Sequence, residues 1–136
     1  MTWVCLVILL ALLEYSLFGA LVSRARKQFG IHAPATTGHP GFERYFRVQQ
    51  NTLEHLILLI PGMLIFAWYL SYVWATVLGL IFVVARIFYA YLYVKEPAQR
   101  HYPAVASGIV TMILVLGGLL GVVLKLILLF GSGIIQ

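Results

Sequence analysis

Residues 3–22 read WVCLVILLALLEYSLFGALV, a run of twenty positions in which Glu14 is the one charged side chain. A helix rises about 1.5 Å per residue, so a run of this length spans a hydrocarbon core about 30 Å thick. The apolar residues are continuous rather than alternating, which favours a helix over a strand of a membrane β-barrel. The run lacks a basic leader and a small-residue cleavage site, so we expect it to be retained as a helix rather than removed as a signal peptide.

Three further apolar runs are long enough to span a bilayer; they cover residues 48–70, 72–94 and 104–130. Hydrophobic residues make up 62% of the chain, and nine basic plus four acidic residues are its only charged ones among 136. This composition excludes a soluble globular domain and a disordered chain. The sequence therefore predicts an all-α membrane protein, with residues 1–136 forming a single integral membrane domain built as a four-transmembrane-helix bundle.

The positive charges indicate an orientation. Seven of the nine basic residues lie between the first and second runs or between the third and fourth: Arg24, Arg26, Lys27, Arg44, Arg47, Lys95 and Arg100. The turn between the second and third runs, around Ser71, carries no charge. The positive-inside rule then places both basic loops in the cytoplasm and both termini on the opposite side. A bacterial inner membrane and the endoplasmic reticulum both fit this arrangement.

Prolines and glycines predict local features of the helices. Pro40 precedes the second run and suits a first helical position, whereas Pro61 lies inside that run and should kink it. Gly117 and Gly121 form a G-x-x-x-G pair in the fourth run, which favours close packing of another helix from the same or another subunit. Flexible filler is the alternative reading of these two glycines.

Two helix faces collect polar groups at membrane depth. Arg47, Asn51 and Glu54 are spaced i, i+4, i+7 and share one face of the second helix, while the third helix carries a second such face, formed by Arg86, Tyr89 and Tyr93. Ionisable groups inside a bilayer are costly unless they meet partners or water, so we expect both faces to point into the protein. The plainer alternative is that Arg47 or Arg86 pairs with Glu54 and only fastens two helices.

These two faces and the basic residues near them carry more polar groups than one ion pair between two helices would need. Several arginines offer sites for anions, Glu54 offers one site for a cation, and the amides and tyrosines offer directed hydrogen bonds. Arginine forks hold carboxylates through two bonds at a time, and a glutamate accepts an ammonium group. This mixture suits a small zwitterion that carries more negative than positive charge.

The stretch FERYFRVQQNTLE at 42–54 resembles the signature of the MAPEG superfamily, the membrane-associated proteins of eicosanoid and glutathione metabolism. The resemblance extends to SRARKQF at 23–29, PATTGHPGFER at 34–44 and ARIFYAYLY at 85–93. It covers the chain from the first run to the start of the fourth, and it is closest to the family's microsomal glutathione transferases and leukotriene-forming enzymes.

The resemblance implies a homotrimer that binds glutathione, as a co-substrate, between neighbouring subunits near the cytoplasmic face. One subunit would hold glutathione through Arg47, Asn51, Glu54, Tyr89 and Tyr93, and its neighbour would add Arg26 and Gln49. His55 stands where leukotriene-forming members have a tyrosine among their glutathione contacts. Arg100 matches the arginine that faces the glutathione sulfur and is the implied catalytic residue.

The activity implied is transfer of glutathione to a lipophilic electrophile, with glutathione peroxidase activity on lipid hydroperoxides as a second reaction. Met112 stands where leukotriene-forming members have a tryptophan over the lipid tail, which favours a general detoxifying transferase. A non-catalytic lipid-binding scaffold, which the family also contains, is the alternative; Arg100 argues against it. A small transporter is a third reading, but the chain lacks the inverted repeats typical of one.

Other partners are not expected. The four histidines show no spacing typical of a metal site, so we expect no metal. The net charge of +5 is explained by attraction to the headgroups of membrane lipids, so we expect no nucleic-acid partner.

Overall fold

The computed structural model describes residues 1–95 and 101–131, and this part of the chain folds into four long α-helices. They are α1 (Thr2–Phe29), α2 (Pro40–Tyr69), α3 (Tyr72–Lys95) and α4 (His101–Gly131). All four are long and apolar enough to cross a membrane, and each contains nearly all of one predicted run. The prediction of an all-α, multi-pass integral membrane protein is confirmed.

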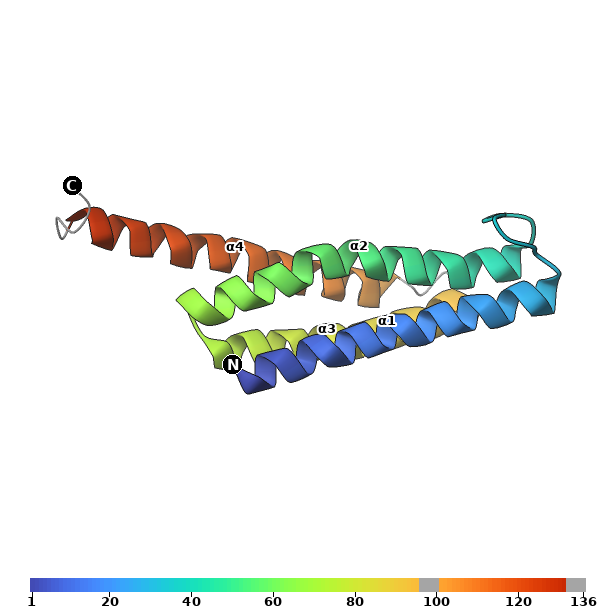
Figure 1. The fold of residues 1–136 in the computed structure, drawn as a ribbon, viewed down its shortest axis with the longest axis horizontal. Coiled ribbons are helices and arrows are strands. Elements are labelled where there is room, and N and C mark those ends of the chain that lie inside the picture. The colour runs from blue at the N-terminus through green and yellow to red at the C-terminus, as the bar shows by residue number, and fades with distance from the viewer. Residues whose placement is uncertain (96–100, 132–136) are drawn as a thin grey trace.

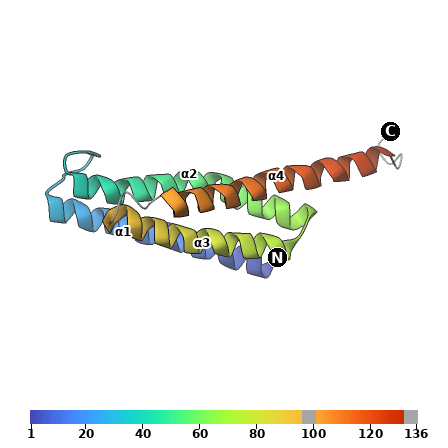
Figure 2. The same ribbon diagram turned by 180° about the vertical axis from the view of Figure 1, so that it is seen from behind.

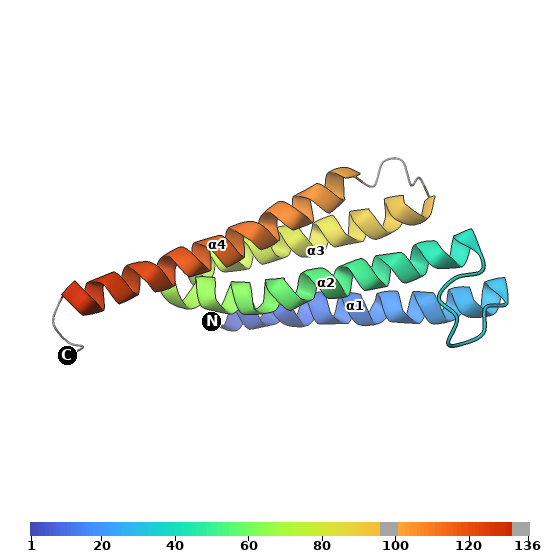
Figure 3. The same ribbon diagram turned by 90° about the horizontal axis from the view of Figure 1, so that it is seen from above.

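The helices form a bundle with α2 and α3 at its centre. α2 packs against α1, α3 and α4, and α3 also packs against α1 and α4. The N-terminus lies beside the short α2–α3 turn, whereas the α1–α2 loop lies at the opposite end, where α3 ends and α4 begins (Figures 1 and 2). The C-terminal part of α4 projects beyond the other three helices (Figure 3).

Two helices extend well past the predicted spans at the basic end of the bundle. α1 continues to Phe29 and stops at Gly30, whose left-handed backbone (φ 66°) lets the amide of Ile31 bond to the Arg26 carbonyl at 3.0 Å. α2 already begins at Pro40, where the His39 ring nitrogen Nδ1 accepts the Gly41 amide at 3.0 Å. Polar residues of both helices are thereby carried beyond the apolar core.

The apolar core runs along the length of the bundle. Its largest cluster joins all four helices and includes Val7, Leu59, Phe82 and Leu114, each almost fully buried. Many large apolar side chains instead lie on the outside, such as Leu17, Ile57 and Leu119. An exposed apolar surface of this extent is typical of a protein surrounded by lipid or by further subunits.

Close packing of α4 on α2 depends on small residues. A Cβ atom added at Gly121 would lie 2.8 Å from Cβ of Tyr69, and one added at Gly117 would lie 2.5 Å from the Phe66 ring. The G-x-x-x-G pair therefore serves tight packing, and it does so within one chain. Pro61 lies inside α2, and the helix bends in the green section of its ribbon around residue 60 (Figure 1).

We predict that Gly121→Ala lowers the free energy of unfolding, because the new methyl group forces α2 and α4 apart at a cost of about 1–3 kcal/mol. Gly108→Ala is the matched control. It adds the same methyl group to the same helix, but its nearest neighbour, Cε1 of His55, is 4.0 Å away. Unfolding curves in detergent measure both variants; equal midpoints would contradict the packing argument.

Candidate functional site

Arg86 is the most deeply buried cation in the described part of the chain, with 1% of its surface exposed. Its Nη2 and Nε donate to Oγ1 of Thr52 at 2.6 and 3.2 Å, and Nη2 also donates to the carbonyl of Val48 at 3.4 Å. The guanidinium carbon lies 4.0 Å from the centre of the Tyr89 ring. These contacts fasten α3 to one turn of α2 and hold the Tyr89 ring against the guanidinium.

Glu14 of α1 is the second buried charge. Only 6% of its surface is exposed, and neither carboxylate oxygen has a hydrogen-bond partner among the residues that the structure describes. The carboxylate and Arg86 attract each other electrostatically without direct contact within ion-pair distance. Glu14 therefore forms no hydrogen bond to a neighbouring helix within the described residues.

Asn51 and Tyr89 form the centre of the predicted site. The side-chain amide of Asn51 donates to the Tyr89 hydroxyl at 2.6 Å, which joins α2 to α3. The rings of Tyr89 and Tyr93 meet edge to face with centroids 5.3 Å apart. About two turns of α2 nearer the basic end, Nη1 of Arg44 donates to the Val94 carbonyl at 3.1 Å. Three of the predicted residues are thus assembled by one chain.

Arg47 and Glu54 flank this centre on the same helix face, but they are exposed on the single chain rather than directed into it. Glu54 has one hydrogen bond among the described residues, a weak one at 3.5 Å from the amide of Gln50. The proposed fastening pair of Arg86 and Glu54 is not formed. Thr52 points toward α3. Glu54 lies two positions further along α2, about 200° around the helix, and therefore points away from α3.

Gln49 and Arg26 lie elsewhere. Gln49 packs against α1, where its Nε2 is 3.1 Å from the Cβ position of Gly19. Because it is two positions from both Arg47 and Asn51, it projects from the other side of α2. Arg26 donates to the Ala35 carbonyl at 2.7 Å and stacks over the Phe42 ring at 4.8 Å. A single chain therefore does not bring these two residues to the Asn51–Tyr89 centre.

The two remaining predicted site residues are His55 and Arg100. His55 is half-buried between α3 and α4, with its ring 6.0 Å from that of Phe82 and its Nδ1 3.5 Å from the Thr111 hydroxyl. Arg100 lies outside the described residues. Within the described ranges, no group of histidine, cysteine and acidic side chains has the geometry to hold a metal ion.

Thr52, the main partner of Arg86, is not among the residues that the sequence predicts for the site. A threonine hydroxyl inside an apolar helix often bonds back to its own backbone, and Thr52 does so with the Val48 carbonyl at 2.7 Å. The available signal was its place beside Asn51 in the polar stretch. The partner itself could not be found that way, because it comes from a helix 34 positions further along the chain.

Comparisons with known proteins identify the family of the chain. A family model described as MAPEG family matches residues 3–121. An uncharacterised protein of Synechocystis is 39% identical over 91% of this chain and 90% of its own length. Human microsomal glutathione S-transferase 2 is 35% identical over 82% of this chain and 76% of its own length. Bovine leukotriene C4 synthase is 33% identical over 85% of this chain and 77% of its own length.

We predict that Arg86→Met lowers the free energy of unfolding by about 3–5 kcal/mol, because it leaves the buried Glu14 carboxylate without a compensating charge. The double variant Glu14→Leu with Arg86→Met should recover much of this loss, since it removes both buried charges. Unfolding in detergent measures the single and double variants. Losses that simply add would show that the two groups do not interact.

Proposed function

The chain belongs to the MAPEG family, and from this premise we propose that it is a membrane-bound glutathione transferase. Glutathione would be its co-substrate, and its second substrate would be a lipophilic electrophile dissolved in the bilayer. Microsomal glutathione S-transferase 2 and leukotriene C4 synthase are both among its relatives, which supports a glutathione-dependent enzyme at the level of the family.

The observation that carries the proposal is the open face of α2 around the Asn51–Tyr89 bond. It presents a guanidinium at Arg47, an amide at Asn51 and a carboxylate at Glu54. The charged side chains of Arg47 and Glu54 are both exposed. Glutathione carries two carboxylates and one ammonium group. Arg47 would hold a carboxylate, Glu54 the ammonium, and Asn51 and Tyr93 the peptide groups between them.

We propose a homotrimer with the glutathione site between neighbouring subunits. Arg47 and Glu54 are exposed on one chain, whereas Gln49 and Arg26 lie on its other side. A neighbour placed against the exposed face would supply its own Arg26 and Gln49 and shield the charged face from lipid. His55, half-buried beside Thr111, would border the same site. The basic end of the bundle would face the cytoplasm.

The proposed chemistry depends on a cation beside the sulfur. A thiol with a pKa of about 8.5 is only a few per cent thiolate at neutral pH, and a guanidinium nearby favours the charged form. Arg100 would supply it. The thiolate then forms a bond to an electrophilic carbon, and the halide or epoxide oxygen takes the electron pair of the bond that breaks. With a lipid hydroperoxide, two glutathione molecules would instead be oxidised to the disulfide as the hydroperoxide is reduced to an alcohol and water.

The test is the ultraviolet absorbance of the glutathione thiolate when glutathione is added to the detergent-purified protein at neutral pH. We expect a thiolate signal in the parent, its loss in Arg100→Ala, and its retention in Arg24→Ala, which removes an exposed arginine outside the proposed site. Binding of glutathione to Arg100→Ala is measured by equilibrium dialysis. Bound glutathione without a thiolate signal in the parent would favour the non-catalytic scaffold; absence of binding would overturn the proposal.

A second prediction concerns Tyr89. Tyr89→Phe removes the hydroxyl that holds the Asn51 amide and should weaken glutathione binding about five- to tenfold, the equivalent of one hydrogen bond of about 1–1.5 kcal/mol. Tyr91→Phe is the matched control, because Tyr91 lies on the same helix and its hydroxyl bonds to Lys95 instead. Equal dissociation constants for the two variants would contradict the role of the Asn51–Tyr89 bond.

A further inference from the structure

Two neighbouring hollows, together called the groove below, lie at the basic end of the bundle. The first is a cavity of about 230 Å³ between α1, α2 and α3, lined by Phe18, Leu21, Tyr45, Val48, Ala90, Tyr91, Val94 and Lys95. The second, also about 230 Å³, is lined by Leu21, Arg24, Ala25, Gln28 and Tyr45. Leu21 and Tyr45 line both hollows, so the two are neighbours that share a wall. Among the described residues assigned to the glutathione site, none lines either hollow.

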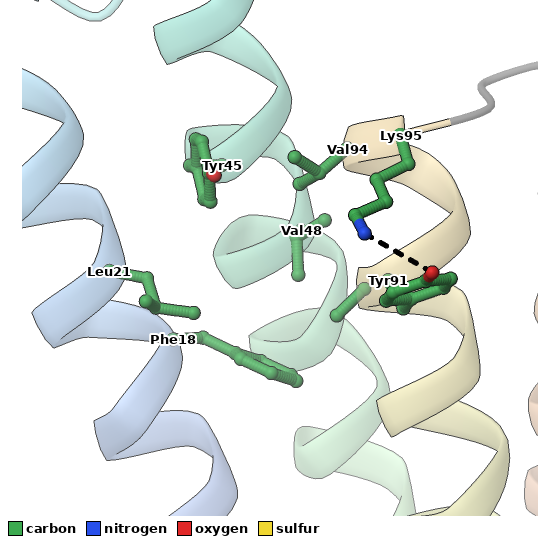
Figure 4. A pocket seen from close by; sticks show the side chains of 8 residues that line it. Phe18, Leu21, Tyr45, Val48, Tyr91, Val94 and Lys95 are labelled. Atoms are coloured by element: carbon green, nitrogen blue, oxygen red, sulfur yellow. Dashed lines mark hydrogen bonds between the residues drawn. The ribbon is translucent and has the colours of Figure 1, made fainter.

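The first hollow is apolar except at its rim. Figure 4 shows Phe18 and Leu21 of α1, Val48 of α2 and Val94 of α3 converging on it from three helices. The Lys95 side chain lies over the cavity. Its Nζ donates to the Tyr91 hydroxyl at 3.2 Å and stands 4.6 Å from the centre of that ring. An aliphatic chain would fit this hollow with an ammonium group at its open end.

The second hollow is polar and basic. Arg24 and Gln28 are exposed on the part of α1 that continues beyond its predicted span, one turn apart on the same side. In the described ranges no carboxylate pairs with Arg24 or with Lys95. The groove therefore changes from apolar to cationic toward the basic end of the bundle, at the depth expected for lipid headgroups.

The groove is separate from the surface that the proposed subunit interface uses on α1. Arg26 is two positions from both Arg24 and Gln28, so it projects from the opposite side of α1. Its bond to Ala35 and its contact with Phe42 hold it there. A neighbouring subunit that contributes Arg26 to a site thus leaves the side of α1 with Arg24 open to the bilayer.

We propose that this groove binds an anionic phospholipid of the surrounding bilayer, with one acyl chain in the apolar hollow and the phosphate between Lys95 and Arg24. A free phosphate would leave the apolar hollow unfilled, and a lipid without net charge would leave the two cations uncompensated. Guanidinium and ammonium groups hold phosphate through charge-assisted hydrogen bonds, and Gln28 adds a neutral donor. Basic pockets between transmembrane helices recognise anionic headgroups in this way.

The test is native mass spectrometry of the detergent-purified full chain, titrated with phosphatidylglycerol or with phosphatidylcholine of the same acyl chains. We expect the parent to retain phosphatidylglycerol more strongly. Each cation near a lipid phosphate is worth about 1 kcal/mol, so Arg24→Gln and Lys95→Gln should each weaken this retention about fivefold, and the double variant about 25-fold. Retention of phosphatidylcholine should fall less in these variants, because its choline group already offsets the charge of its phosphate.

Two controls locate the effect. Lys27→Gln removes a positive charge from the same end of α1 at a position that lines neither hollow, so it should leave retention unchanged. Ala90→Phe fills the apolar hollow while keeping both cations, and it should weaken retention of both lipids. Equal retention of the two lipids by the parent would overturn the proposal without reference to any variant. So would equal losses in Lys27→Gln and Lys95→Gln, which would indicate attraction to the net charge alone.

Discussion

The guanidinium of Arg86 must satisfy its donors inside an apolar bundle, and the central part of the structure follows from how it does so. No water-filled route is needed, because Thr52 and the Val48 carbonyl of α2 accept its hydrogen bonds. These hydrogen bonds fix the position of α3 against α2. It also fixes the Tyr89 ring against the cation and thereby brings the Tyr89 hydroxyl to Asn51. A buried charge that serves helix packing thus also orders the centre of the proposed glutathione site.

The charged residues on either side of that centre are exposed, whereas Arg86 is buried. Arg47 and Glu54 are exposed on a helix whose other exposed side chains are mostly apolar, such as Leu53, Ile57 and Leu58. Exposed charges at this depth are costly to a lone subunit, but they suit a surface on which a polar ligand and a second subunit meet. The proposed glutathione site and the proposed trimer are therefore linked. Glutathione would compensate the charges of the exposed face, and the neighbouring subunit would shield them from lipid.

The basic end of the bundle concentrates the features proposed for binding. α1 and α2 both continue past the apolar span there, so their arginines and amides lie where water, headgroups and bilayer meet. On one side of α1 lies the groove with Arg24 and Lys95, which would face lipid in the proposed trimer. On the other side, Arg26 is held by the α1–α2 loop. The two proposed anions would therefore bind on opposite sides of α1: glutathione on the side of Arg26 and the anionic phospholipid on the side of Arg24.

The sequence by itself determined the membrane class, the four helices and the family, because continuous apolar runs and the motif at 42–54 are local patterns that need no partner to be recognised. It also placed Asn51 and Tyr89 in one site, through the resemblance. Only the tertiary structure decided that Arg86 bonds to Thr52 rather than to Glu54, and that Glu14 is buried without a hydrogen-bond partner among the described residues. Those outcomes depend on how helices distant in sequence rotate and approach, which periodicity along one helix does not specify.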